Sequence, residues 1–145
     1  MTTRPMSVCA ELDLRLVVPG SSSLPVRAEL RYDVNDPYAV QVAFQTGTSG
    51  GPHDVVEWTF GRQLLGDGVG SAAGEGDVQV WPSTSSGESV VCLSLSSPTG
   101  RALFEVPLRA LVSFLGRTYD AVPAGSEGVH LDLDAELALL LWAEP

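Results

Sequence analysis

Apolar and polar residues alternate along the first half of the chain with the two-residue period of half-buried strands. The alternation runs through residues 11–16, 26–33, 38–44 and 55–60. Between the second and third runs stands Asn35-Asp36-Pro37, a combination of residues that is typical of a turn. The pattern therefore predicts four strands, of which the middle two form a hairpin.

A short helix is predicted directly after the fourth strand, at residues 61–65. It runs into Gly66-Asp67-Gly68-Val69-Gly70, where glycine lowers helix propensity and removes side-chain contacts. We therefore expect the helix to end at Gly66 and a mobile loop to extend from there to Gly76.

Three further strands are predicted at residues 77–81, 89–96 and 102–106. The last two are joined by Ser97-Pro98-Thr99-Gly100. This sequence fits a type I turn, because proline presets φ at the second position and glycine is favoured at the fourth. A second hairpin is expected here.

Two helices are predicted in the C-terminal part. The first begins at Pro107, a favoured first-turn residue, and apolar residues recur at helical spacing until Pro123 prevents continuation. The second begins near Asp132 and is apolar on both faces, so it must be covered on more than one side. A second subunit or a groove between the sheets of the same chain could provide this cover. The candidate oligomer-contact residues are Leu137, Leu140, Leu141 and Trp142.

The length and the order of elements predict one α+β domain over residues 1–145, with the order ββββ-α-βββ-α-α. Eighteen acidic residues against eight basic ones give a formal charge of -10, and all eight basic residues are arginines. Binding to nucleic acid depends on neutralising phosphates, so this charge argues against it. The longest apolar run, residues 137–143, is much shorter than the roughly 20 residues of a membrane span. Without a signal-peptide pattern or a membrane anchor, the chain is expected in the cytoplasm.

The sequence contains no recognisable catalytic or metal-binding pattern. His53 and His130 lack a Gly-x-Ser-x-Gly partner, so no hydrolase triad is indicated. Asp33 and Asp36 stand at a turn, and Asp132 and Asp134 at a helix start, where aspartate is favoured structurally. Both segments depart from a calcium loop, because Tyr38 and Leu137 occupy the positions of the sharp-turn glycine. We expect no catalytic residue, metal or cofactor.

Cysteine and tryptophan residues are expected to pack in the interior. Cys9 and Cys92 are isolated and are interpreted as small buried thiols in a reducing compartment. Trp58 and Trp81 continue apolar strand faces, which favours core packing over stacking on nucleic-acid bases.

Several short motifs occur in an order and spacing that together are quite specific. They are Leu30-Arg31-Tyr32-Asp33, Asp36-Pro37-Tyr38-Ala39-Val40, residues 56–65, Gly74-Glu75-Gly76-Asp77-Val78, Val80-Trp81-Pro82-Ser83, Leu95-Ser96-Ser97-Pro98 and His130-Leu131-Asp132-Leu133-Asp134. Over nearly the whole chain they closely resemble the SsgA-like sporulation and cell-division proteins of actinobacteria. Cys9-Ala10-Glu11-Leu12 and residues 14–18 look most like the SsgB branch.

This resemblance implies a non-enzymatic regulator of cell division that acts in the cytoplasm at the septum. It would mark septum sites during sporulation-specific septation, recruit the tubulin-like GTPase FtsZ and promote its polymerisation. Another SsgA-like protein is a possible further partner. The implied fold is similar to that of the whirly single-stranded nucleic-acid binders: two antiparallel sheets packed across each other, with helices, assembled as a homotrimer.

The partner surface does not follow from these motifs. We expect it around the first helix, at Arg62, Gln63 and Asp67, because an exposed helix beside flexible glycines can adapt to a partner. On this basis, Arg62→Glu should weaken recruitment without altering thermal stability. The alternative functions are a single-stranded nucleic-acid-binding whirly-type trimer and an enzyme of unrecognised type.

Overall fold

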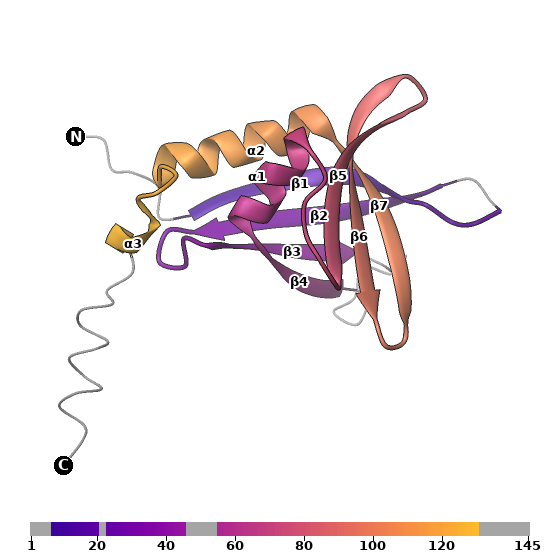
Figure 1. Cartoon of the computed structure of the whole chain (residues 1–145), viewed down its shortest axis with the longest axis horizontal. Helices are drawn as coiled ribbons and strands as arrows, with labels where there is room; N and C mark the ends of the chain where they lie inside the picture. Colours follow the sequence, from indigo (N-terminus) through magenta and orange to yellow (C-terminus); the bar gives the residue numbers. More distant parts are fainter. Residues whose placement is uncertain (1–6, 21–22, 46–54, 131–145) are drawn as a thin grey trace, which may run out of the picture.

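The computed structural model describes residues 7–20, 23–45 and 55–130 (Figure 1). The order of elements is four strands, a helix, three strands and two helices, and the predicted order is confirmed as far as the second helix. The elements are β1 (Ser7–Leu16), β2 (Leu24–Asp33), β3 (Ala39–Gln45), β4 (Val55–Gly61), α1 (Arg62–Gly70), β5 (Val78–Ser85), β6 (Glu88–Ser97), β7 (Gly100–Pro107), α2 (Leu108–Ala121) and α3 (Glu127–His130).

The seven strands form one antiparallel sheet with the order β4-β3-β2-β1-β7-β6-β5. Its central junction is narrow, because β1 and β7 pair only at Arg15↔Glu105 and Leu16↔Phe104. The sheet therefore has two halves, β1–β4 and β5–β7, which cross each other in Figure 1. We expected two separate sheets, whereas the structure joins all the strands in a single hydrogen-bonded sheet.

The core lies between the two halves and under the helices. Phe44 of β3 stacks on Phe104 of β7, with the ring centroids 4.6 Å apart, so side chains from opposite halves meet directly. On β2, Ala28, Leu30 and Tyr32 are buried in alternation, as the hydrophobic pattern predicts. Helix α2 packs on β1, β6 and β7, and α1 packs on β5 and α2.

The glycines of α1 lie inside the helix, so the prediction that it ends at Gly66 is wrong. Gly68 is buried, and a Cβ atom at this position would overlap the side chain of Val80 on β5. Gly66 similarly faces the hydroxyl group of Tyr119 on α2. Close packing against neighbouring elements therefore compensates for the low helix propensity of glycine.

The C-terminal part differs from the prediction in one further element. The structure contains the four-residue helix α3 after α2, which the sequence pattern did not indicate. The helix predicted over residues 132–142, with Leu137, Leu140, Leu141 and Trp142, lies outside the described residues. No helix in the described part is long and apolar enough to cross a membrane.

Candidate functional site

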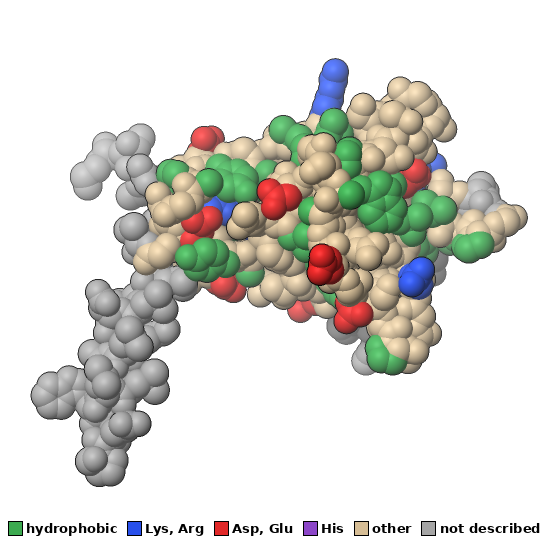
Figure 2. All heavy atoms as spheres, in the orientation of Figure 1, with side chains coloured by type: hydrophobic (Ala, Val, Ile, Leu, Met, Phe, Trp, Pro, Cys, Tyr) green, Lys and Arg blue, Asp and Glu red, His purple; other side chains and the backbone are tan. Residues whose placement is uncertain are grey.

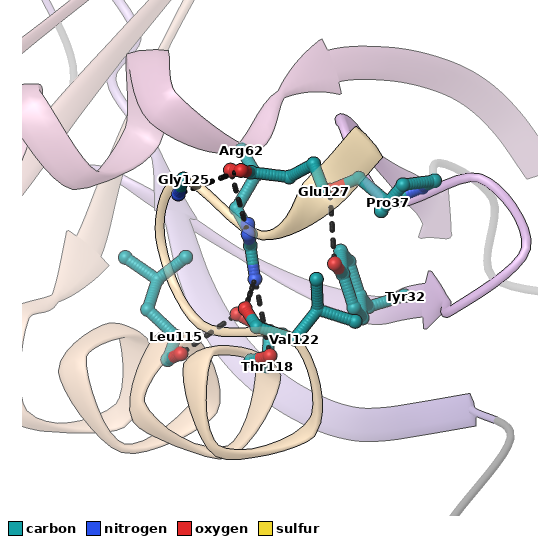
Figure 3. Close-up of polar contacts among 8 residues, drawn as sticks. All are labelled: Tyr32, Pro37, Arg62, Leu115, Thr118, Val122, Gly125 and Glu127. Atoms are coloured by element: carbon teal, nitrogen blue, oxygen red, sulfur yellow. Dashed lines mark hydrogen bonds and ion pairs between the residues drawn. The ribbon is translucent and has the colours of Figure 1, made fainter. Parts of the chain in front are cut away.

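Arg62 is the first residue of α1 and follows β4 directly. Its side chain is only 1% exposed, and its guanidinium group joins three segments that are distant in sequence (Figure 3). Nη1 donates hydrogen bonds to the carbonyl oxygens of Thr118, at 3.0 Å, and Val122, at 2.7 Å. Nη2 donates to Oε2 of Glu127 at 2.9 Å and forms an ion pair with it. Arg62 thus connects the start of α1 with the end of α2 and with α3.

Two tyrosine rings flank the same guanidinium group. Its central carbon lies 4.2 Å from the ring centroid of Tyr119 and 4.9 Å from that of Tyr32. Both distances are within the range of cation–π attraction, which is stronger where the charge is desolvated. The Tyr32 hydroxyl group donates a hydrogen bond to the Pro37 carbonyl at 2.9 Å, and this bond fixes the ring against the turn after β2. We call Arg62, Tyr32, Tyr119 and Glu127 the arginine cluster.

The position of the positive charge agrees with the electrostatics of α2. The last carbonyl groups of a helix lack partners within the helix and carry partial negative charge. The Arg62 guanidinium group binds two carbonyls at this end of α2. The Thr118 hydroxyl group donates to the Leu115 carbonyl at 2.7 Å, so the last turn is also tied internally.

The titration of two groups reflects this environment. The pKa of Glu127 lies below its usual value, because the carboxylate accepts a hydrogen bond from its own backbone N–H and another from Arg62. The Gly125 N–H also donates to this carboxylate, at 2.7 Å. Burial raises the pKa of Tyr32, and the nearby charge of Arg62 acts in the opposite direction. Glu127 is therefore the anion that the cluster holds in its charged form.

This geometry corrects one expectation from the sequence. Arg62 was expected to be exposed for contact with a partner, but its side chain is buried and fully occupied by internal contacts. Arg62→Glu would place a second carboxylate beside Glu127, so the expectation of unchanged thermal stability is wrong on physical grounds. Gln63 and Asp67 are exposed on α1, and a role for them in partner binding stays a prediction.

One sequence signal could have indicated the burial of Arg62. A cation is unfavourable at the N-terminus of a helix, where the dipole is positive. The positions three and four residues later are Leu65 and Gly66, so α1 offers no carboxylate for a local ion pair. An arginine placed in this way requires distant acceptors.

The other residues considered for chemistry have structural roles or are dispersed. Oδ1 of Asp33 accepts a hydrogen bond from the Asn35 N–H at 2.8 Å, as expected for an aspartate at a turn. Within the described ranges, no group of three or more His, Cys, Asp or Glu residues is placed to hold a metal ion. Cys92 is buried, and burial raises the pKa of its thiol. Cys9 is exposed, so the expectation that both thiols are buried is wrong for this residue.

A broad groove of about 650 Å³ lies on the outer face of β1, β2 and β3. Its charged lining residues are Glu11, Glu29, Asp33, Asp36 and Arg31. The single arginine pairs with Glu29, which leaves the groove with a negative charge. Acidic side chains are also spread over the face of the molecule in Figure 2. A surface of this sign repels a phosphate backbone.

Comparison with known proteins gives a consistent result. The family model described as Streptomyces sporulation and cell division protein, SsgA, matches residues 26–127. The sporulation-specific cell division protein SsgB of Frankia casuarinae is 59% identical over 145 residues, which cover 100% of this chain and 99% of that protein. The protein of the same name from Streptomyces coelicolor is 56% identical over 135 residues, covering 93% and 96%.

A solved structure is also similar to this chain. It is the crystal structure of an SsgA-like sporulation-specific cell division protein from Thermobifida fusca, with 43% identity and a TM-score of 0.82. The alignment covers 95% of this chain and 98% of that one. The names of these relatives support a role in cell division.

Proposed function

Because the chain belongs to the SsgA family of sporulation and cell division proteins, we propose that it is a non-enzymatic regulator of sporulation-specific septation. In this proposal the protein marks septum sites, recruits the GTPase FtsZ to them and promotes its polymerisation. The observation that carries the proposal is the 59% identity over the full chain to a protein named sporulation-specific cell division protein SsgB. The protein would act in the cytoplasm at the septum, where a partner would hold it at the membrane.

The architecture is compatible with an adaptor. The arginine cluster fixes α1 against α2 and α3, so the exposed side chains of Gln63 and Asp67 stand on a rigid support. Such a support favours binding, because little conformational entropy is lost when the partner arrives. We therefore place one candidate contact with FtsZ on the outer face of α1.

Assembly into a whirly-like homotrimer is part of the proposal. Three copies of a weak site could engage several subunits of one FtsZ filament, which raises the effective affinity without a strong single contact. The apolar residues Leu137, Leu140, Leu141 and Trp142 are the proposed contacts between copies. Another SsgA-like protein is a second candidate partner. A strictly monomeric protein in analytical ultracentrifugation would contradict the trimer.

The test of recruitment is co-sedimentation of the purified protein with FtsZ polymers, with GTP and with GDP, at physiological salt. Enrichment in the GTP pellet, or an increase in polymer, is the expected result. Asp67→Arg should reduce the enrichment, and Asp120→Arg is the matched control on α2, where the aspartate is also exposed. No effect of the wild-type protein on either readout would contradict direct recruitment. Salt-dependent binding of an oligonucleotide would instead favour the nucleic-acid alternative.

A further inference from the structure

The sheet has two edge strands, β4 and β5, and the edge at β5 is blocked at two of its outward positions, Val80 and Pro82. The Val80 N–H donates to the Ala73 carbonyl at 2.9 Å, and the Ala73 N–H donates to the Val80 carbonyl at 2.8 Å. Two residues further along β5, Pro82 has no N–H to offer. A covering segment and an edge proline are both recognised means of preventing further strand pairing.

At β4, no segment of the described chain covers the edge, and the strand contains no proline. The Arg62 N–H donates to the Tyr38 carbonyl at 2.8 Å, so these two residues are a hydrogen-bonded pair at the end of the antiparallel β3–β4 ladder. In such a ladder every second residue of a strand bonds to the partner strand, and the residues between them point their backbone groups the other way. By this alternation Val55, Glu57 and Thr59 direct their backbone N–H and C=O groups away from β3. Within the described part of the chain, these three residues make no other backbone hydrogen bond. The open edge therefore offers a row of donors and acceptors.

An apolar groove of about 300 Å³ lies beside this open edge. Its apolar lining comes from both halves of the sheet and includes Leu16, Phe44, Val56, Trp58, Leu95 and Phe104. Val56 is 43% exposed, a large fraction for a valine on the inward-facing side of a strand. Thr99 and Arg101 of the β6–β7 hairpin line it as well. The groove thus lies between the inner face of β4 and the β6–β7 hairpin.

We propose that the β4 edge and this groove bind an extended segment of the recruited FtsZ as an added strand. This inference rests on the proposed function, because it specifies how the partner is held. The backbone of the segment would pair with Val55, Glu57 and Thr59, and its alternate side chains would enter the groove. Main-chain bonds supply affinity in such strand addition, and pockets for alternate side chains supply specificity. The segment should carry apolar residues at every second position.

Charge favours a foreign segment over a second copy of this chain. If two β4 strands paired antiparallel through their open edges so that Val55, Glu57 and Thr59 of both strands were all paired, the two Glu57 side chains would lie directly opposite each other. Like charges at these positions are destabilising. A segment from another protein can place a neutral or basic residue opposite Glu57. Such a segment can therefore form hydrogen bonds with the outward N–H and C=O groups of β4 without this repulsion.

The first test uses proline at one position of each edge strand. Thr59→Pro removes one of the outward N–H groups of the open edge, and the β3–β4 ladder does not use this N–H. Thr84→Pro is the matched control: Thr84 is also an exposed threonine, and on β5 it follows Val80 and Pro82 in the outward alternation. We expect Thr59→Pro to weaken co-sedimentation with FtsZ polymers by about tenfold, and Thr84→Pro to leave it unchanged. Thermal unfolding of both variants confirms that they are folded.

The second test changes the groove and leaves the backbone unaltered. Val56→Glu introduces a charge into the apolar lining, and Val112→Glu is the control on α2, because these valines are 43% and 46% exposed. Only Val56→Glu should weaken binding. Hydrogen exchange gives an independent readout, in which FtsZ polymers should slow exchange at the outward amides of Val55, Glu57 and Thr59.

The outcomes separate this inference from the proposed function. Wild-type enrichment together with unchanged binding of Thr59→Pro and Val56→Glu would overturn strand addition and leave recruitment intact. Failure of the wild-type protein to sediment with FtsZ would overturn both. If Thr59→Pro dissociated the protein itself into smaller species, the edge would join copies of this chain, and the inference would be wrong.

Discussion

Replacing Arg62 by methionine tests whether the arginine cluster stabilises the fold. The substitution keeps an unbranched apolar stem and removes every hydrogen bond of the guanidinium group. The Thr118 carbonyl keeps a donor, because the Val122 N–H bonds to it at 2.8 Å. The Val122 carbonyl loses its side-chain donor. Glu127 keeps the Gly125 N–H and is partly exposed to water. The largest single loss is therefore at the Val122 carbonyl.

The magnitude follows from these contacts. A buried acceptor left without a partner costs about 1–3 kcal/mol, and each desolvated cation–π contact contributes about 1–2 kcal/mol. We expect Arg62→Met to lower the free energy of unfolding by about 3–7 kcal/mol, the sum of one unpartnered acceptor and two cation–π contacts, which is a large part of the roughly 5–15 kcal/mol of a typical domain. With a urea m-value of about 2 kcal/mol/M, the midpoint of unfolding should fall by about 1.5–3.5 M.

The assay is urea unfolding at pH 7, followed by far-ultraviolet circular dichroism. Arg62→Lys should show a smaller loss, because it retains the positive charge but not the planar fork that reaches both carbonyls. Gln63→Met is the control in the same helical turn. Gln63 is exposed, so this change should stay within about 0.5 kcal/mol of the wild type. If Arg62→Met stayed within about 1 kcal/mol of the wild type, the structural role of the cluster would be refuted.

Two further changes test neighbouring features. Gly68→Ala should destabilise the protein by about 1–3 kcal/mol, because the new methyl group overlaps Val80; Gly70→Ala, which meets no atom within 4 Å, should not, and thermal unfolding compares the two. The pKa of Glu127 is depressed from its ordinary 4.5 in the folded protein, so its contribution to stability is present above the unfolded pKa and is lost as the pH falls through the folded pKa. The difference in unfolding free energy between pH 6 and pH 3 should therefore be smaller in Glu127→Gln than in the wild type, and an equal difference would contradict this.

The strands were predictable because their signal is local. On β2, alternate residues face the core, and the printed sequence shows this period directly. The turn Asn35-Asp36-Pro37 and the hairpin at Pro98 are likewise local, since their residue types fix the backbone angles. By contrast, the junction between β1 and β7 rests on only two paired positions. No local pattern identifies such a junction, so the single continuous sheet could not be predicted.

The two wrong predictions for α1, its end and the exposure of Arg62, also arise because local sequence does not show contacts with distant parts of the chain. Propensity correctly identifies Gly68 as unfavourable for a helix, but the compensating contact comes from Val80 on another element. Arg62 was expected to be exposed because its helix adjoins flexible glycines, whereas its acceptors at Thr118, Val122 and Glu127 are 56 to 65 residues away in the chain. Tertiary contacts override local preference at both positions. Predictions from local pattern fail where the stabilising partner is distant.

The two proposed contact surfaces belong to one continuous segment, because β4 ends at Gly61 and α1 begins at Arg62. The arginine cluster fixes the joint between them, so it sets the position of the α1 face relative to the open edge of β4. A change at Arg62 could therefore abolish recruitment without removing any contact with FtsZ. Substitutions at Asp67 and Thr59 do not carry this ambiguity, since both side chains are exposed. If Asp67→Arg and Thr59→Pro each weaken binding while the unfolding free energy is retained, FtsZ contacts both surfaces. If only one does, the other surface is free for a different partner.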